Sequence, residues 1–251
     1  MWNNYLSFAK ELVKECGEII KANAGNAGTE TFKSKTDIVT AMDLEAENWM
    51  IKRIQEHFPE HRIFSEEVGA IGNSGDFEWV IDPIDGTVNY SVGLPFYGIS
   101  LALVHSGQTV VAATSLPALG EIFWASAGGG AFLNGKKIKV RDASLAEAFV
   151  SFGDFSKEGN RQSNHCRLAA LSAIANEVFR IRMVGSAALS LAYIACGRLD
   201  AAVYVRPNRY DVVGGMLLIQ EAGGIRCEKA GYTVYGSQKV TNPLAELLPE
   251  L

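Results

Sequence analysis

Apolar residues recur at helical spacing in two stretches near the start of the chain. Across residues 2–22 they fall three or four positions apart with Lys and Glu between them, which predicts an amphipathic helix. Residues 40–58 repeat this spacing behind a capping pair and before a proline, so a second helix is expected there. Residues 23–29 are rich in Gly, Asn and Ala and predict a loop, after which residues 30–35 suit a strand or hairpin arm.

The middle of the chain alternates apolar runs with turn residues, a pattern typical of antiparallel strands. The runs are residues 98–105, 109–114, 121–125 and 131–140. Asn134-Gly135 has the chemistry of a two-residue hairpin turn. The triple glycine at residues 128–130 lacks the Lys and Ser/Thr that follow the glycines of a P-loop, so we expect a hairpin bend there rather than a phosphate cradle.

From residue 148 onward, expected strands and helices alternate along the chain. Strands are predicted over residues 148–152, 178–183 and 201–205, and helices over residues 161–175, 186–196 and 211–222. This order favours a sheet covered by helices. No repeat or linker divides the sequence, so we expect one domain over residues 1–251, with approximate halves at 1–147 and 148–251.

Composition and charge narrow the class of protein. The chain has 251 residues, of which 48% are hydrophobic, enough for a substantial core. Its net charge is -5 and no Lys/Arg cluster stands out, which argues against binding to a nucleic-acid polymer. The four cysteines form no CxxC pair, so neither a zinc site nor a disulfide framework is indicated. No signal core or membrane-spanning run is present, and we expect a soluble, cytoplasmic protein without a membrane partner.

Candidate chemistry concentrates at residues 79–90. An apolar run there ends at Asp82, and Pro83 cannot donate to a strand ladder, so we expect the strand to stop at Asp82. Gly86 then permits a close approach of the backbone to a ligand, and a helix is expected to begin at about this residue. The free N–H groups at the start of that helix favour an anion, although Asp82 and Asp85 would repel one.

A cation between the carboxylates and the anion resolves that conflict. Hard oxygen ligands suit Mg²⁺, and phosphate oxygens can complete its shell, so the predicted chemistry is metal-assisted transfer of a phosphoryl group to water. The same Asp-Pro-x-Asp-Gly residues are also typical of a type I turn without function. The turn and the metal site both stay open on the residues of this motif alone.

Other candidate residues also have ordinary structural interpretations. Asp43 pairs with Thr40 as a helix cap, and Asp211 and Ser186 stand where helix starts are expected. Glu66 follows an apolar run, as the first of two consecutive acids that would suit a solvated surface.

The motif is part of a longer run of residues that resembles the signature of a known protein family. Its residues are Asp82-Pro83-Ile84-Asp85-Gly86-Thr87, then Asn89-Tyr90, and they resemble the signature of the inositol monophosphatase family. A second element of that family is similar to Tyr210-Asp211 through Glu221-Ala222-Gly223-Gly224. The resemblance implies a layered αβαβα sandwich of the inositol monophosphatase/fructose-1,6-bisphosphatase type. It also implies a Mg²⁺-dependent, lithium-sensitive phosphomonoesterase that forms a homodimer.

The resemblance also implies roles for individual residues. One Mg²⁺ would be held by Glu66, Asp82 and the Ile84 carbonyl, a second by Asp82, Asp85 and Asp211, and a third, weaker ion near Glu66. Asp43 and Thr87 would orient a water that the first metal polarises, which makes Asp43, Thr87 and Glu66 the catalytic residues. Phosphate and substrate would contact Asp85, Gly86, Thr87, Gly185, Ser186 and Asp211.

The sequence departs from the family at the substrate side. Many inositol-specific members carry an acid seven residues before the final Asp, where this chain has Tyr204. Arg206 and Arg209 follow, and they suit either a second phosphate or carboxylate of the substrate or a solvated surface. Lys33 and Lys35 are alternative candidates for the family's pocket lysine.

The small phosphorylated substrate therefore stays open. Inositol monophosphate, fructose 1,6-bisphosphate, 3′-phosphoadenosine 5′-phosphate and NADP are all candidates. A catalytically silent protein that binds metal or a sugar phosphate is the alternative from another class. The presence of both Asp43 and Thr87 favours the enzyme, because a silent protein would be expected to lack a group that orients the nucleophile.

Overall fold

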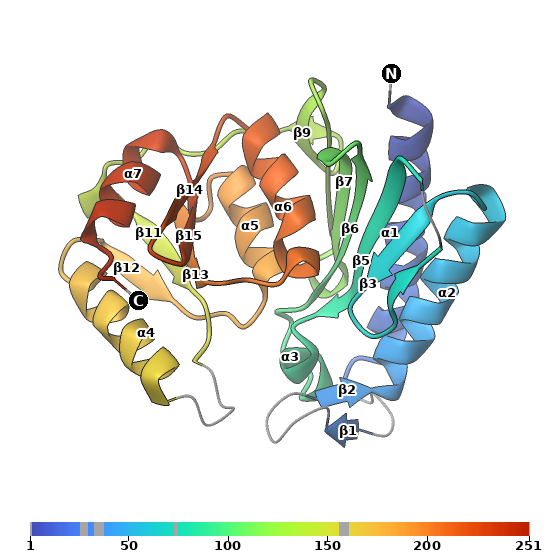
Figure 1. Cartoon of the computed structure of the whole chain (residues 1–251), viewed down its shortest axis with the longest axis horizontal. Coiled ribbons are helices and arrows are strands. Elements are labelled where there is room, and N and C mark those ends of the chain that lie inside the picture. The colour runs from blue at the N-terminus through green and yellow to red at the C-terminus, as the bar shows by residue number, and fades with distance from the viewer. Residues whose placement is uncertain (1, 26–29, 33–37, 73–74, 156–160, 251) are drawn as a thin grey trace.

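The computed structural model describes residues 2–25, 30–32, 38–72, 75–155 and 161–250. Figure 1 shows five alternating layers of helices and sheets, so the predicted αβαβα sandwich is confirmed. The outer helices of the first sheet are α1 (Asn3–Ala22) and α2 (Ala41–His57); the central layer is α5 (Ala187–Ala195) and α6 (Arg209–Glu221); the last layer is α4 (Arg161–Ile174) and α7 (Gln238–Leu247).

The first sheet is 8-stranded in the described residues and has the order β10-β9-β8-β7-β6-β5-β3-β4. Its strands are β3 (Arg62–Ser65), β4 (Gly69–Ile71), β5 (Phe77–Asp85), β6 (Gly98–His105), β7 (Gln108–Leu116), β8 (Glu121–Ser126), β9 (Gly130–Leu133) and β10 (Lys136–Lys137). Neighbours are antiparallel except β3 and β5. The predicted hairpins are confirmed, and Asn134 and Gly135 turn with φ of 46° and 84°.

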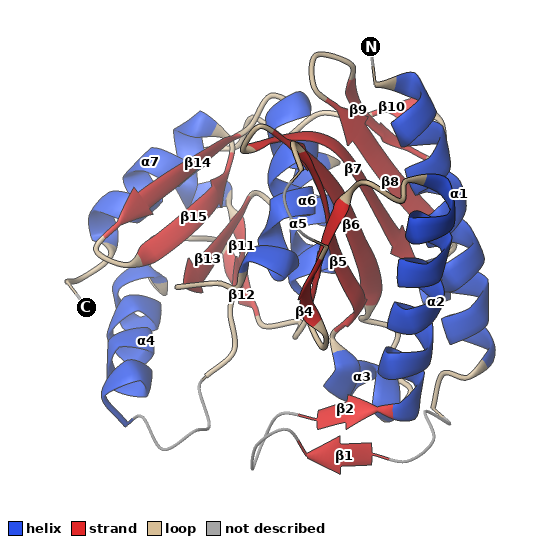
Figure 2. Ribbon diagram, turned by 45° about the vertical axis from the view of Figure 1, so that its right-hand side comes forward, coloured by secondary structure: helices blue, strands red, loops and turns tan. Residues whose placement is uncertain are grey.

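The second sheet is 5-stranded, with the order β12-β11-β13-β15-β14. Its strands are β11 (Phe149–Phe152), β12 (Arg180–Arg182), β13 (Ala201–Val205), β14 (Ile225–Lys229) and β15 (Tyr232–Gly236). A third, small sheet pairs β1 (Glu30–Phe32) with β2 (Ile38–Thr40) and lies apart from the larger sheets beside α3 (Thr87–Ser91) (Figure 2). The candidates Lys33 and Lys35, and the end of the strand predicted over 30–35, lie outside the described residues.

The central layer explains two features of the sequence. Helix α5 is buried on nearly all sides, because sheets or helices cover it all round, and it is accordingly mostly apolar, with the Ser190 hydroxyl bonded to the Ser186 carbonyl. It approaches α6 so closely that a Cβ at Gly215 would lie 2.5 Å from the Leu191 Cβ. No helix among the described residues is both long and apolar enough to cross a membrane.

Strand β5 differs from the prediction at its end. We expected it to stop at Asp82, but it continues to Asp85. The ladder with β6 shifts register between Asp82 and Asp85, so the missing N–H of Pro83 falls within an irregularity instead of breaking the strand. This extension places Asp85 at the end of β5, three residues beyond Asp82.

A candidate metal and phosphate site

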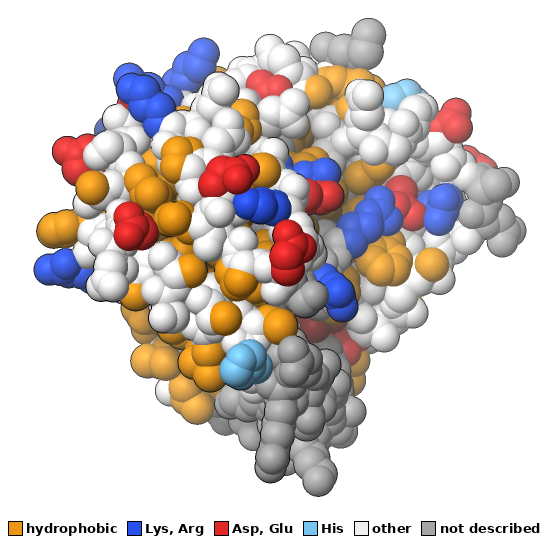
Figure 3. Space-filling view, turned by 60° about the vertical axis from the view of Figure 1, so that its left-hand side comes forward, with side chains coloured by type: hydrophobic (Ala, Val, Ile, Leu, Met, Phe, Trp, Pro, Cys, Tyr) orange, Lys and Arg blue, Asp and Glu red, His pale blue; other side chains and the backbone are white. Residues whose placement is uncertain are grey.

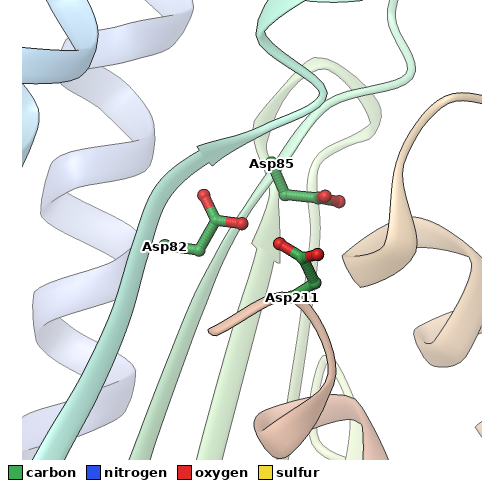
Figure 4. A group of neighbouring side chains, drawn as sticks. All are labelled: Asp82, Asp85 and Asp211. Carbon is green, nitrogen blue, oxygen red and sulfur yellow. The ribbon is translucent and has the colours of Figure 1, made fainter. Parts of the chain in front are cut away.

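Three carboxylates from two distant segments converge at the end of β5. Asp82 and Asp85 extend from that strand and Asp211 from the first turn of α6, and their ligand oxygens all lie within 4.8 Å of one another. Figure 4 shows the three side chains directed toward a common space. Asp82 and Asp85 are buried and Asp211 is half-buried, so the cluster lies at the inner end of an accessible space.

The electrostatics of this cluster fit a divalent cation. Burial raises the pKa of Asp82 well above its ordinary value, and Glu66, Asp85 and Asp211 raise it further by repulsion. Burial, with the charges of Asp85 and Glu66, raises the pKa of Asp211 to about 8. Among the described residues, Asp82 Oδ1 is buried without a hydrogen-bond donor. Carboxylate oxygens that repel one another in this way are suited to Mg²⁺.

Asp85 also joins the two halves of the structure. Its carboxylate accepts hydrogen bonds from the Ser186 hydroxyl and from the N–H groups of Ala187 (3.1 Å) and Ala188 (2.7 Å), at the start of α5. Burial raises the pKa of Asp85 to about 6, although these hydrogen bonds oppose the rise. Ser186 is at the same time the N-cap of α5, because its Oγ accepts from the Leu189 N–H.

Asp43 both caps helix α2 and accepts a hydrogen bond from Thr87 across the site. Its carboxylate accepts from the Thr40 N–H (2.9 Å) and hydroxyl (2.5 Å) in the predicted capping box of α2. The other oxygen accepts from the Thr87 hydroxyl at 2.9 Å, which is the bond that the family resemblance implies. Thr87 Oγ1 also lies 3.0 Å from the Ile84 carbonyl, so β5, α2 and α3 meet at one hydroxyl group.

Gly86 makes the turn between β5 and α3 possible. Its φ is 90°, in the left-handed region, and a Cβ there would lie 2.8 Å from the Phe96 carbonyl and 3.1 Å from the Gly185 carbonyl. Helix α3 begins at Thr87, so the predicted helix start at about Gly86 is confirmed.

Glu66 lies in the turn after β3. This turn is held by Glu47, a residue of α2 that the sequence analysis did not identify. Glu66 contributes to the raised pKa values of Asp82 and Asp211, although it lies outside the group of three oxygens. The adjacent Glu67 N–H donates to Glu47 Oε1 at 2.9 Å. Glu47 is 0% exposed on α2, one turn after Asp43, and its place in the buried stripe of that helix was the available signal.

A cavity of about 700 Å³ extends from these carboxylates. Its lining includes the predicted residues Glu66, Asp82, Ile84, Asp85, Gly86, Thr87, Gly185, Ser186, Arg206 and Asp211. Asp43 reaches it through Thr87. Asp154 and Arg167 also line the cavity; neither adjoins a recognisable motif, so only the fold reveals them.

Comparison with known proteins identifies the family. The model of the inositol monophosphatase family matches residues 1–248. The chain belongs to the inositol monophosphatase family. A Thermotoga maritima relative named fructose-1,6-bisphosphatase/inositol-1-monophosphatase is 36% identical over 230 residues, which are 90% of this chain and 85% of the relative. A Nus factor SuhB from Xylella fastidiosa is 40% identical over 200 residues, 79% of this chain and 72% of that protein.

Solved structures support the same membership in the inositol monophosphatase family. The extragenic suppressor protein suhB from Bartonella henselae superposes with a TM-score of 0.92 at 27% identity, with 98% of each chain covered. The Thermotoga maritima IMPase superposes with a TM-score of 0.89 at 32% identity, covering 98% of this chain and 96% of that one. The layered fold and the family are therefore both established.

Within this family fold, the two arginines before Asp211 have different surroundings. The Arg209 guanidinium pairs with Glu78 and lies 5.5 Å from the centre of the Phe64 ring, and it is absent from the lining of the carboxylate cavity. Arg206 lines that cavity. Tyr204 lines it as well, with its hydroxyl oxygen buried. Of the two arginines, Arg206 is therefore the one that lines the carboxylate cavity.

Proposed function

We propose that this protein is a Mg²⁺-dependent phosphomonoesterase that hydrolyses a small phosphate ester by direct attack of water. The observation that carries the proposal is the buried convergence of Asp82, Asp85 and Asp211 beside the bonded pair Asp43 and Thr87. A purely structural role would leave several buried carboxylates repelling one another, at a cost of several kcal/mol per ion. Family membership and the name of the Thermotoga relative support the same activity.

The ligand set proposed for the metal is the one expected from the sequence. Glu66, Asp82, Asp85, Asp211 and the Ile84 carbonyl would hold two Mg²⁺ ions, with a third, weaker ion near Glu66. Bound Mg²⁺ supplies positive charge to the phosphoryl oxygens and makes a coordinated water more acidic. The carboxylates supply the negative charge that retains the ions, and the burial of Asp82 strengthens that attraction.

The chain's own groups orient the attacking water. With its hydroxyl hydrogen directed to Asp43 Oδ1, Thr87 Oγ1 retains lone pairs that can accept a hydrogen bond from water. This fixes the water oxygen for in-line attack on phosphorus. A P–O bond forms to the water oxygen as the ester P–O bond breaks, the water gives up a proton and the leaving oxygen takes one, and the products are an alcohol and inorganic phosphate. No covalent phosphoenzyme is required.

The finer assignments belong to the same proposal. Inositol monophosphate or a related ester is the substrate class, with fructose 1,6-bisphosphate, 3′-phosphoadenosine 5′-phosphate and NADP as alternatives. Lithium sensitivity, a homodimer and a cytoplasmic location are expected for such an enzyme. A role as a Nus factor is a second candidate, favoured by the 40% identity to the Xylella protein of that name.

Phosphate release from a panel of esters tests the activity. The panel holds inositol 1-phosphate, fructose 1,6-bisphosphate, 3′-phosphoadenosine 5′-phosphate, NADP and glycerol 2-phosphate, each with Mg²⁺, with chelator and with added Li⁺. Asp82→Asn should lower Mg²⁺-dependent release by at least about 100-fold. Asp142→Asn is the matched control, because Asp142 is an exposed acid paired with Lys239 far from the cluster in sequence. No turnover of any ester by a metal-binding wild type would favour the silent binding protein.

A further inference from the structure

One face of strand β5 carries a second carboxylate besides that of Asp82. Side chains alternate between the two faces of a strand, so Glu78, Val80 and Asp82 point to the same face of β5. Trp79 and Ile81 point to the other face, where they belong to the core that α1 and α2 cover. The face that presents Asp82 to the carboxylate cluster therefore also presents Glu78, four residues earlier.

The first turns of α6 pack against that face of the sheet. Val80 forms a small hydrophobic cluster with Ala102 and Val104 of β6, and Tyr210 and Val213 of α6 pack against it. Hydrophobic burial is non-directional, so it keeps α6 on the sheet without orienting the start of the helix. The orientation of the first turn therefore depends on further contacts.

An ion pair supplies a directional contact at the first residue of α6. The Arg209 guanidinium pairs with the Glu78 carboxylate, and it lies 5.5 Å from the centre of the Phe64 ring. Phe64 lies on β3, two residues before Glu66. Glu78 lies on β5, four residues before Asp82. The start of α6 is thus joined to both strands that lead into the proposed metal site.

The burial of Glu78 distinguishes this pair from exposed ion pairs. Figure 3 shows Lys and Arg side chains beside Asp and Glu on one face of the molecule, and exposed pairs contribute little to stability. Lys239 and Asp142 form an exposed pair, with side chains 66% and 72% exposed. The Glu78 side chain is only 11% exposed, and it pairs with Arg62 at 3.0 Å as well as with Arg209. A carboxylate this buried requires its partners, because an unpaired buried charge is costly.

The carboxylate cluster opposes the position of α6 when no cation is bound. Oxygens of Asp82, Asp85 and Asp211 lie within 4.8 Å of one another, and ionised carboxylates at such distances repel. This repulsion acts to separate the first turn of α6 from β5. Arg209 begins that turn, two residues before Asp211, and its attraction to Glu78 acts in the opposite direction.

We propose that Glu78 and Arg209 are positioning residues of the metal site, which hold Asp211 beside Asp82 before a cation binds. The inference rests on the proposed function, since it takes these carboxylates to be Mg²⁺ ligands. Neither Glu78 nor Arg209 lines the carboxylate cavity, so both act through Asp211. Without the pair, the first turn of α6 leaves β5 in part of the molecules, and the affinity for Mg²⁺ falls with the fraction that remains competent.

Calorimetric titration of Mg²⁺ tests this role. Glu78→Gln and Arg209→Gln should each raise the Mg²⁺ dissociation constant by about 10-fold, and Arg209→Lys, which keeps the cation, should recover part of the affinity. The double variant should bind little worse than either single variant, because both changes remove one pair. Glu121→Gln is the matched control and should bind Mg²⁺ like the wild type. Glu121 accepts from Arg198 in a pair of similar burial, and neither residue lines the carboxylate cavity.

Two further measurements separate positioning from a general loss of stability. In chelator, the free energy of unfolding should fall in both Glu78→Gln and Glu121→Gln, whereas the Mg²⁺ dissociation constant should rise in Glu78→Gln alone. At saturating Mg²⁺, the kcat of Glu78→Gln should return to within about threefold of the wild-type value, because the bound cation then holds Asp211 in place.

The outcomes distinguish this inference from the proposed function. If Glu78→Gln binds Mg²⁺ within about twofold of the wild type, or if Glu121→Gln loses as much affinity, the positioning role is wrong while the phosphatase proposal stands. If the wild type binds Mg²⁺ but hydrolyses no ester, the phosphatase proposal fails, and the same dissociation constants still decide the role of Glu78. A wild type that binds no Mg²⁺ would overturn both proposals.

Discussion

At the scale of single residues, the site depends on side chains that each have two partners. Asp43 accepts from Thr40 on its own helix and from Thr87 across the site. Asp85 lies within the carboxylate cluster and accepts from the start of α5. Because both partners restrict rotation, these carboxylates are held in place before any ligand arrives.

Gly86→Ala should disrupt the turn that carries Thr87 into the site. The new Cβ would meet the Phe96 carbonyl at 2.8 Å and would require φ of 90° from an L-residue. We expect a loss in the free energy of unfolding, measured in urea, that exceeds the about 1–2 kcal/mol of a positive φ alone, because the close Cβ contacts add to it. Gly107→Ala is a suitable control, since Gly107 has φ of 79° but open space around it. Equal losses in the two variants would show that the contacts of Gly86 are unimportant.

The buried acids should make the metal-free protein sensitive to pH. The pKa of Asp211 is about 8 against an ordinary value of 3.8, so the folded state binds more protons than the unfolded state between these values. Stability contributed by the protonated group is present at low pH and is lost as pH rises toward 8. In chelator, thermal unfolding should therefore shift to lower temperature from pH 5 to pH 8, and Mg²⁺ should reverse the shift.

Asp211→Asn isolates that effect. Without metal at pH 8 it should raise the free energy of unfolding by on the order of 1–3 kcal/mol, because it removes a repelling buried charge. With Mg²⁺ the variant should instead be less stable than the wild type, since it lacks a proposed metal ligand. A variant that unfolds like the wild type at pH 8 in chelator would contradict the electrostatic account of the cluster.

At the scale of elements, helix α2 supports both sides of the site. Asp43 holds Thr87, and Glu47, one turn later, holds the turn of Glu66 and Glu67. Glu47 is buried, so its carboxylate serves the interior and not the solvent. The helix thereby contacts both Thr87, which is proposed to orient water, and the turn that carries the proposed metal ligand Glu66.

Glu47→Ala should weaken metal binding, although Glu47 is not one of the proposed metal ligands. It leaves the Glu67 N–H without its acceptor and frees the turn, so we expect about a 10- to 100-fold rise in the Mg²⁺ dissociation constant, measured by calorimetry. Glu47→Gln keeps one acceptor oxygen and should recover most of the affinity. If Glu47→Gln binds Mg²⁺ as poorly as Glu47→Ala, the carboxylate acts by its charge and not by positioning the turn.

The elements were largely predictable from the sequence, and the site only in part. Hydrophobic spacing and turn residues predicted helices such as α1 and hairpins such as Asn134-Gly135, because both signals are local. The convergence of Asp82 and Asp211 came from the family resemblance, since no local pattern reports contacts between distant segments. The continuation of β5 past Pro83 was missed, because pairing with β6 overrode the local rule.

At the scale of the whole molecule, the site is a junction between the two large sheets. Asp85 at the end of β5 accepts from the first turn of α5, and Asn89 of α3 donates through Nδ2 to the Val184 and Phe96 carbonyls at 2.8 Å. Figure 1 shows α3 below the gap that α5 and α6 fill. The packing of α6 against the first sheet therefore decides whether Asp211 meets Asp82 and Asp85.

Asn89→Asp tests this junction with little change of shape. A carboxylate would face two carbonyl oxygens in place of an amide N–H₂ group, so we expect a loss of roughly 1–3 kcal/mol in the free energy of unfolding and a weaker Mg²⁺ response. Asn89→Ala should cost less, because it introduces no repulsion. If chemical denaturation showed that Asn89→Ala loses more free energy of unfolding than Asn89→Asp, the proposed role of Asn89 would be wrong.

Asp82, Asp85 and Asp211 are proposed to form a metal-dependent phosphatase site. The most direct measurement is calorimetric titration of Mg²⁺ into the wild type, Asp82→Asn and Asp142→Asn, with phosphate release followed on the same samples. We predict that the wild type and Asp142→Asn bind Mg²⁺ and hydrolyse the ester, while Asp82→Asn does neither at the same metal concentration. Full hydrolysis by Asp82→Asn, or hydrolysis by the wild type in chelator, would contradict the account.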